Sequence, residues 1–124
     1  MSTLIRIVVA EVALAAELFD TPCAEGIVDL LPLETIPNLW GDEFYFEVPL
    51  KHGPDHTATS DVEIGDIGYW PPGRALAIFF GPTPMSTGSK PVPASEVNLI
   101  GRITGDTDAL KGVRGAARIR IEAA

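Results

Sequence analysis

Residues 61–84 read Asp61-Val-Glu-Ile-Gly65-Asp-Ile-Gly-Tyr-Trp70-Pro-Pro-Gly-Arg-Ala75-Leu-Ala-Ile-Phe-Phe80-Gly-Pro-Thr-Pro84 and decide the fold. The stretch holds a Gly-Asp-Ile-Gly turn, an aromatic pair, a rigid Pro-Pro-Gly bend and an unbroken apolar run. A short apolar run between fixed turns is typical of a buried strand. We therefore expect a strand over residues 75–80 that rigid loops enter and leave.

Composition indicates one globular domain over residues 1–124, with a hydrophobic content of 46% that supports a packed core. The formal charge of −8 disfavours nucleic acid and anionic membrane surfaces as partners. The only cysteine, Cys23, cannot form an internal disulfide. Arg6 and Glu11 interrupt the N-terminal apolar stretch, so we expect neither a signal peptide nor a membrane span. These features predict a cytoplasmic protein.

Alternating apolar residues predict further strands, over 5–10, 12–18, 40–49, 97–103 and 117–121. In the third of these, phenylalanines face one way while glutamates and a tyrosine face the other. Asp20-Thr21-Pro22 predicts the start of a short helix, because a capping side chain precedes a proline in the first turn. About seven short strands with one or two short helices indicate an antiparallel barrel or sandwich.

Several landmarks follow one another in a recognisable order. They are Thr21-Pro22 with Leu30-Leu31-Pro32, Trp40-Gly41-Asp42-Glu43, the segments 65–73 and 79–84, and Asn98-Leu99-Ile100-Gly101-Arg102-Ile103. Over nearly the whole chain this order resembles a small family of bacterial and archaeal cyclophilin-like proteins, relatives of the peptidyl-prolyl isomerase cyclophilins. The resemblance implies a mainly β fold, a closed antiparallel eight-stranded barrel with one or two short helices.

The resemblance extends to the fold but not to the catalytic groups. Cyclophilins use an arginine that polarises the prolyl amide, supported by a glutamine and framed by phenylalanine, tryptophan and histidine. Phe80 takes the place of the pocket phenylalanine, but Ile78 stands where the glutamine would be and Val97 near the histidine. Residues 43–48 contain no arginine, and Arg74 in the adjacent loop is a weak substitute. Without donors for the twisted amide, we expect no efficient prolyl isomerase activity.

Aromatic side chains and a few polar groups predict a ligand-binding cleft, the usual composition of small-molecule sites. The leading hypothesis is therefore a barrel that binds a small molecule or a peptide. In the alternative interpretation the two tryptophans cap the barrel and Glu43 is solvated. The candidate ligand-binding residues are Trp40, Glu43, Tyr45, Tyr69, Trp70 and Phe80.

Two further hypotheses belong to other functional classes. The first is an enzyme that uses Glu43 or Asp66 as a general base, its pKa raised by surrounding aromatic groups. For Asp66 we favour a structural role, in which the carboxylate binds backbone N–H groups of its turn. The second is a protein-interaction module that uses the proline-rich loop 81–94, including contact between two copies in a homodimer.

We expect no cofactor and no metal site. The loop around His52, Asp55 and His56 offers suitable ligand types, but its Gly-Pro pair prevents a helix that would align the two histidines. It is therefore interpreted as a surface loop, and Cys23 as a small buried hydrophobe. Arginines at 118 and 120 alternate along one strand and indicate a solvated face.

Overall fold

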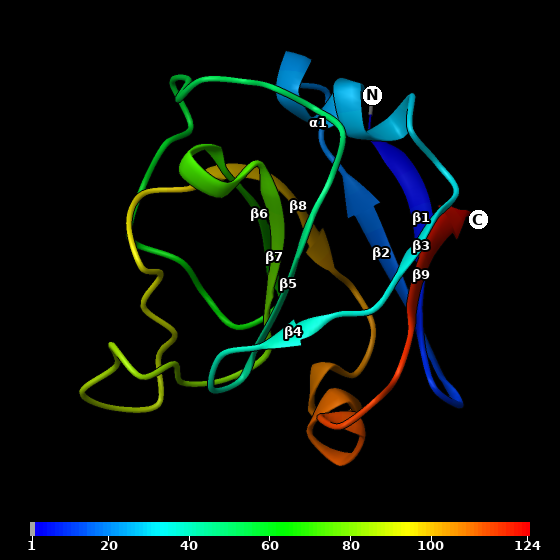
Figure 1. The fold of residues 1–124 in the computed structure, drawn as a ribbon, viewed down its shortest axis with the longest axis vertical. Coiled ribbons are helices and arrows are strands. Elements are labelled where there is room, and N and C mark those ends of the chain that lie inside the picture. The colour runs from blue at the N-terminus through cyan, green and yellow to red at the C-terminus, as the bar shows by residue number, and fades with distance from the viewer. Residues whose placement is uncertain (1) are drawn as a thin grey trace.

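In a computed structural model that describes residues 2–124, nine strands form one antiparallel sheet (Figure 1). The strands are β1 (Thr3–Val9), β2 (Val12–Leu18), β3 (Leu33–Thr35), β4 (Asn38–Leu39), β5 (Glu43–Glu47), β6 (Asp66–Trp70), β7 (Ala75–Phe79), β8 (Asn98–Ile103) and β9 (Ile119–Ala123). The helical segments of the same residues are α1 (Pro22–Val28), η1 (Pro71–Gly73) and η2 (Thr107–Val113).

The sheet curls strongly, with the strand order β3-β9-β1-β2-β8-β6-β7-β5-β4. Its two edge strands, β3 and β4, are separated in the chain by only Ile36 and Pro37. The sheet must therefore curl round until its edges approach each other, which gives the half-barrel seen in Figure 1. This mainly β architecture is consistent with the expected cyclophilin-like barrel. The strand count exceeds eight because two very short strands form the edges.

Most of the predicted elements are confirmed. The hairpin of β1 and β2 turns at Ala10, whose φ of 53° gives the tight turn expected there. The helix α1 begins after Thr21, whose side chain accepts a hydrogen bond from the Ala24 N–H at 3.2 Å. One assignment differs: residues 66–70 form strand β6, although Gly-Asp-Ile-Gly was expected to be a turn. Only Gly65 (φ 97°) belongs to the turn, because β6 pairs with both β7 and β8 from Asp66 or Ile67 onward.

The main core fills the inside of the curled sheet. There the inward-facing side chains of the strands pack against the helical segments. Cys23, Ala24 and Ile27 of α1 enter this core at one end of the half-barrel. Leu110 and Val113 of η2 enter it at the other end (Figure 1). The two helical segments thus close the ends of the curl.

Strand β7 is buried on both faces, and this positions the site described below. Its inward residues Leu76 and Ile78 belong to the main core. Its outward residues Ala77 and Phe79 belong to a second, smaller cluster, together with Val62 and Val97. A second layer of chain therefore covers the outer face of the sheet at β7.

No helix among residues 2–124 is both long enough and apolar enough to cross a membrane.

Candidate functional site

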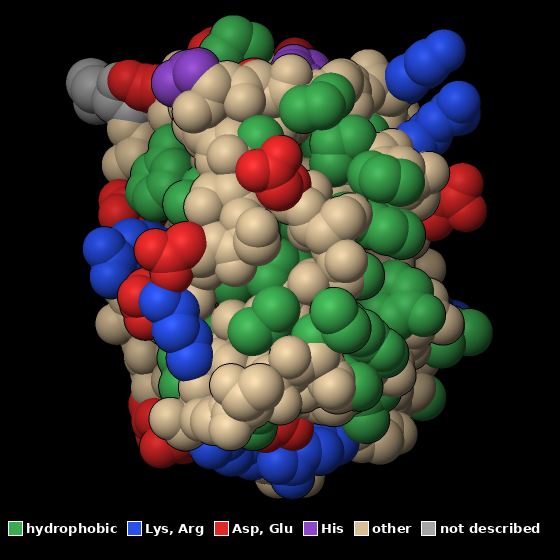
Figure 2. Space-filling model, turned by 90° about the vertical axis from the view of Figure 1, so that its left-hand side faces the viewer, with side chains coloured by type: hydrophobic (Ala, Val, Ile, Leu, Met, Phe, Trp, Pro, Cys, Tyr) green, Lys and Arg blue, Asp and Glu red, His purple; other side chains and the backbone are tan. Residues whose placement is uncertain are grey.

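A pocket of about 220 Å³ lies on the outer face of β5 and β7. Aromatic and small apolar side chains form most of its wall, and one carboxyl group contributes to it. The lining residues are Trp40, Glu43, Tyr45, Trp70, Ala75, Ala77, Phe79, Pro93, Ala94 and Val97. Figure 2 shows the side of the molecule that carries the long loop after β7, where hydrophobic side chains cover much of the surface and Lys and Arg lie at its margins.

The register of the strands explains why there is a hollow at this position. Glu43 of β5 lies opposite Phe79 of β7, and Tyr45 lies opposite Ala77. On the other side of β7, Gly68 of β6 also lies opposite Ala77. Because outward residues of neighbouring strands share one face, large groups on β5 stand beside two positions with almost no side chain. The small residues leave the space that the aromatic rings enclose.

Loop residues complete the wall from the other side. Val97 packs directly over Gly68, where an added Cβ would lie 2.8 Å from a Val97 methyl carbon. The indole N–H of Trp70 donates to Ser95 Oγ at 2.6 Å, which fixes the ring against the loop. Hydrogen bonds within the proline-rich loop support its shape, including Thr83 Oγ1 to the Val92 carbonyl. Loop 81–94 thus forms part of the pocket through its last two residues.

A tight hairpin places Trp40 at the rim. The Trp40 N–H donates to the Glu43 carbonyl at 2.9 Å, and Gly41 between them has a φ of 59°. Asp42 anchors the turn, since its carboxylate accepts from Arg114 Nε at 2.7 Å and from Nη2 at 3.2 Å. This two-point ion pair joins the hairpin to the segment after η2. Such bidentate pairs hold geometry better than single contacts.

Glu43 is the one ionisable group in the pocket wall that is buried. Its side chain lies on the outward face of β5, yet the residue is only 7% exposed because the second layer covers it. Its Oε1 atom is buried and has no hydrogen-bond partner among residues 2–124. Burial raises the pKa of Glu43 to about 7. At neutral pH the carboxyl can therefore act as a hydrogen-bond donor, as an acceptor or as an anion.

The structure brings together four of the six residues proposed from the sequence: Trp40, Glu43, Tyr45 and Trp70 all line the pocket. Tyr69 and Phe80 lie elsewhere, fully buried in the main core. The reason is the alternation of side chains along a strand, which turns the neighbours Trp70 and Phe79 outward when Tyr69 and Phe80 point inward.

The core position of Tyr69 gives it a structural task. Its hydroxyl donates to the Leu50 carbonyl and accepts from the His52 N–H, the latter at 3.2 Å. Phe80 packs against Phe44 with ring centroids 4.9 Å apart. Both side chains therefore support the barrel from inside and do not line the pocket.

Two weaker candidates also lie outside the pocket. Asp66 accepts a hydrogen bond from the Glu63 N–H at 2.8 Å, the backbone contact that the sequence favoured for it. Burial raises the pKa of Asp66, although that bond and Arg102 oppose the rise. Arg74 is exposed, has a φ of 49° after η1, and lines a separate surface groove. Neither side chain is among the residues that line the pocket beside Glu43.

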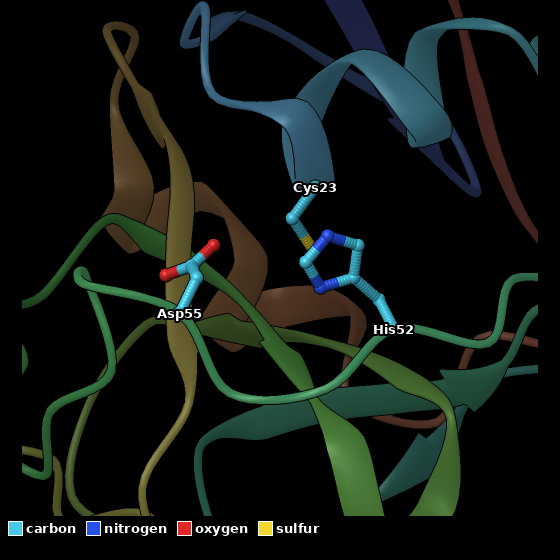
Figure 3. Close-up of side chains that lie close together, drawn as sticks. All are labelled: Cys23, His52 and Asp55. Atoms are coloured by element: carbon cyan, nitrogen blue, oxygen red, sulfur yellow. The ribbon is translucent and has the colours of Figure 1, made fainter.

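A second cluster of reactive side chains was not expected from the sequence. Cys23 of α1 lies beside His52 and Asp55 of the following loop, and their ligating atoms are within 4.8 Å of one another (Figure 3). The other histidine of the loop, His56, is exposed and does not belong to the cluster. Cys23 comes from a helix 29 residues earlier in the chain than His52, so no local spacing could reveal it.

Asn98 organises this second cluster from β8 and is fully buried. Its amide oxygen accepts from the Asp55 N–H at 3.0 Å. Its amide nitrogen donates to the Gly53 carbonyl at 3.0 Å and to Cys23 Sγ at 3.7 Å. In the sequence, the sign of this cluster is an asparagine, Asn98, within the otherwise largely apolar strand predicted over 97–103. A buried asparagine needs hydrogen-bond partners, and here the cluster supplies them.

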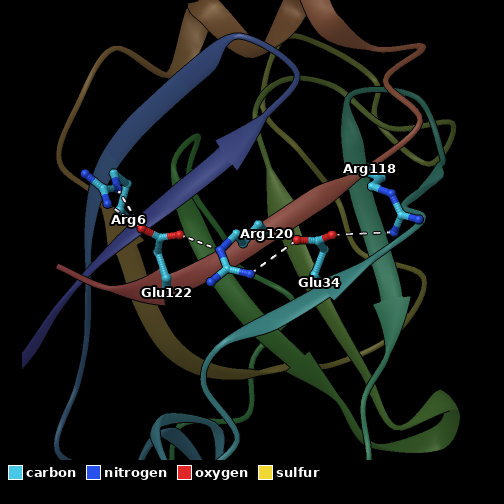
Figure 4. Close-up of polar contacts among 5 residues, drawn as sticks. All are labelled: Arg6, Glu34, Arg118, Arg120 and Glu122. Carbon is cyan, nitrogen blue, oxygen red and sulfur yellow. Dashed lines mark hydrogen bonds and ion pairs between the residues drawn. The ribbon is translucent and has the colours of Figure 1, made fainter.

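The arginines of β9 and its approach belong to a charge ladder (Figure 4). Arg120 donates to Glu122 at 2.6 Å and to Glu34 at 3.2 Å, while Arg6 of β1 pairs with Glu122. Arg118 lies 3.6 Å from Glu34. Each arginine on this face is therefore matched by a carboxylate, in agreement with the solvated charged face expected from the sequence.

Comparisons with known proteins agree with the fold and the landmarks. Residues 3–122 match the family described as cyclophilin-like. The solution structure of a hypothetical protein from Archaeoglobus fulgidus is similar, with 36% sequence identity and a TM-score of 0.80, over 99% of this chain and 95% of that chain. Among curated proteins, none matches this chain. The match over almost the entire length, together with the curled sheet, shows that the chain belongs to the cyclophilin-like family.

Proposed function

We propose that the protein binds a small molecule or a short peptide in the pocket beside Glu43, and that it lacks efficient prolyl isomerase activity. The observation that carries the proposal is the buried Oε1 atom of Glu43, which has no partner among the described residues. A buried polar group without a hydrogen bond costs about 1–3 kcal/mol. A ligand that supplies the missing bond recovers that free energy, so the pocket is prepared for one.

The chemistry of the wall favours a particular class of ligand. Trp40, Tyr45 and Trp70 present aromatic surfaces, and Glu43 presents a carboxyl among them. An apolar ligand with a basic nitrogen would bury its body against the rings and place its cation beside the carboxylate. Cation–π attraction and a charge-assisted hydrogen bond would both stabilise it. The volume of about 220 Å³ suits a small group, such as a metabolite fragment or one side chain of a peptide.

The same wall lacks what prolyl isomerisation needs. No arginine or glutamine is among the lining residues, and Ile78 points into the main core. Stabilising a twisted prolyl amide requires a positioned hydrogen-bond donor. A proline-peptide isomerisation assay should therefore show no turnover at the level of a true cyclophilin, and such turnover would contradict this part of the proposal.

A fragment screen tests the binding proposal directly. Two-dimensional NMR of the ¹⁵N-labelled protein should find ligands enriched in basic nitrogens that shift the indole signals of Trp40 and Trp70. Glu43→Gln should weaken the binding tenfold or more, because a charge-assisted hydrogen bond contributes about 1.5–3 kcal/mol. Ala77→Leu should abolish it by filling the hollow between the rings.

Glu47→Gln is the matched control, since Glu47 lies on the same strand face but is exposed. It should leave the affinity unchanged. Ligands that shift residues remote from the pocket, or that bind Ala77→Leu as tightly as the wild type, would contradict the proposal.

One observation favours a second candidate, an enzyme in which Glu43 is a general base or acid. A carboxyl group with a pKa of about 7 exchanges protons readily at neutral pH. This function would show as chemical conversion of a bound ligand, lost in Glu43→Gln while Ala77→Gly retains it. Stable, unchanged ligands in the NMR tube would favour the binding function.

A further inference from the structure

We propose that Cys23, His52 and Asp55 form a binding site for a divalent transition metal ion, with zinc as the best match. The site lies between α1 and the loop that follows β5, and none of its three residues lines the pocket at Glu43. Sulfur, imidazole nitrogen and carboxylate oxygen are the donor types that zinc takes in proteins, and a set of three leaves a fourth position for water. The three ligating atoms already lie within 4.8 Å of one another.

His52 and Asp55 each have one side-chain atom held by the protein and one left for a ligand. His52 Nδ1 lies 2.7 Å from the Gly53 carbonyl, which can only accept, so Nδ1 carries the hydrogen and Nε2 keeps its lone pair. In Figure 3 the ring nitrogen on the Cys23 side is the one away from the loop backbone. A backbone carbonyl that fixes the imidazole in this way is the usual outer support of a metal-bound histidine.

Asp55 shows the same division. Its Oδ1 accepts from the Thr57 N–H at 2.7 Å and from the Thr57 hydroxyl at 2.5 Å. Its Oδ2 is buried and has no hydrogen-bond partner among residues 2–124. A buried carboxylate oxygen without a partner is unfavourable unless something binds it, and a metal ion would do so.

Cys23 supplies the third donor from the N-terminal turn of α1. The residue is fully buried, and the Asn98 amide group points at its sulfur from 3.7 Å. Burial raises the pKa of the thiol, and Asp55 adds to the rise while Asn98 opposes it. Metal binding must therefore displace the thiol proton to the solvent. In a tetrahedral site with bonds of roughly 2.0–2.3 Å, ligand atoms lie roughly 3.3–3.7 Å apart, so the cluster has to contract by about 1 Å.

The same residue types could serve as nucleophile, base and orienting acid in a hydrolase, but the geometry disfavours this. In such a triad the carboxylate accepts from the imidazole N–H, whereas here the Gly53 carbonyl does. The sulfur also has no exposed surface for a substrate to reach. A metal ion has an entry path, since His52 borders a surface groove of about 610 Å³.

Cobalt titration of the chelator-treated, reduced full-length protein tests the proposal. One equivalent of Co²⁺ should produce a thiolate-to-cobalt charge-transfer band with visible d–d bands of four-coordinate intensity, and Zn²⁺ should abolish them by competition. Titration calorimetry in buffers of different ionisation enthalpy should show release of one proton per metal ion. Cys23→Ser should remove the charge-transfer band, and Asp55→Asn and His52→Ala should weaken binding at least tenfold.

His56→Ala is the matched control, since it removes an exposed histidine from the same loop and should leave the titration unchanged. Circular dichroism of each variant establishes that the barrel is folded. Absence of the charge-transfer band in the folded wild type would overturn the proposal. So would a band that persists in Cys23→Ser, or a metal response lost in His56→Ala but kept in His52→Ala.

Discussion

At the scale of single residues, Glu43 shows how an ordinary strand position becomes a site. Its alternation with Phe44 places it on the outer face, where a glutamate is normally solvated. The second layer over β7 removes the water instead. Burial raises the pKa of Glu43 above its ordinary value of 4.5 to about 7, so the folded protein holds a proton that the unfolded chain releases.

This shift predicts a pH dependence of stability. Because the folded-state pKa is the higher one, the contribution of Glu43 to stability is greatest below about 4.5 and falls as the pH rises through about 7. The loss attributable to Glu43 is up to about 3 kcal/mol, from about 1.4 kcal/mol per pKa unit. Glu43→Gln should lack this part of the slope and be the more stable protein at alkaline pH. Urea unfolding at several pH values measures it, and equal slopes in both proteins would contradict the assignment.

Tyr69 gives a second prediction at this scale. Tyr69→Phe removes the hydroxyl that binds the Leu50 carbonyl and the His52 N–H, and leaves both partly buried groups without this partner. The expected loss of stability is about 1–3 kcal/mol. Hydrogen exchange should also become faster at the His52 amide. An unchanged free energy of unfolding would show that water replaces the hydroxyl.

Residue roles were predictable from the sequence only where polar and apolar side chains alternate clearly, so that the inward and outward positions of a strand can be distinguished. The pattern Glu43-Phe44-Tyr45-Phe46 assigned the outward pair correctly, because side chains with a polar group alternate there with apolar ones. The run 75–80 is apolar throughout, so nothing in it distinguishes Phe79 from Phe80. The sequence therefore assigned Phe80 to the pocket wall, whereas Phe79 lines the pocket and Phe80 lies in the core. Cys23 and His52 meet only through tertiary packing, which no spacing encodes.

At the scale of elements, the hairpin between β4 and β5 controls the rim of the pocket. Gly41 is required twice over, because its φ of 59° disfavours a side chain and an added Cβ would lie 2.8 Å from Thr83 Cα. The Trp40-Gly41-Asp42-Glu43 landmark is thus a turn that brings a ring and a carboxyl to one opening.

Gly41→Ala should therefore destabilise the hairpin and separate it from the proline-rich loop. We expect a loss of about 1–3 kcal/mol from backbone strain, with the larger shifts in an NMR spectrum at Trp40 and at residues 82–84. Gly88→Ala is the control, since an added Cβ at Gly88 has no atom within 4 Å. A Gly41→Ala protein with wild-type stability would contradict the geometry.

Element boundaries were predictable where a cap or an alternating pattern marks them. Thr21-Pro22 marked α1, and the alternation over 12–18 marked β2. The strands β3 and β4 were not predicted, since two or three residues carry no periodic pattern. Residues 66–70 contain glycine and aspartate, which favour turns, but pairing with two neighbours overrides that local preference.

At the scale of the whole molecule, the half-barrel separates two surfaces with different tasks. The β5–β7 side carries the pocket under a second layer of chain. The β1–β9–β3 side carries the charge ladder of Figure 4. Hydrogen bonds from Arg6, which has the larger effect, and from Arg120 hold the pKa of Glu122 below its usual value.

The charge ladder predicts that the protein loses stability at acid pH, through the carboxyl group of Glu122. A carboxyl with a depressed folded-state pKa stabilises the fold above its unfolded value of 4.5, and the contribution is lost as the pH falls through the folded-state pKa. Glu122→Gln should thus be less stable than the wild type at neutral pH, and the difference should shrink in acid and at about 1 M salt. Thermal unfolding measures this, with Glu11→Gln as control. If the stability difference between Glu122→Gln and the wild type changed with neither salt nor acid, the proposed role of these ion pairs would be contradicted.

The proposed function depends most directly on the carboxyl group of Glu43 being buried in the pocket and available to a ligand. A ¹³C NMR titration of the Glu43 side-chain carboxyl in the ligand-free protein measures this without any assumption about the ligand. The structure predicts a midpoint of about 7. A midpoint close to the ordinary 4.5 would show a solvated carboxylate and contradict the proposed site.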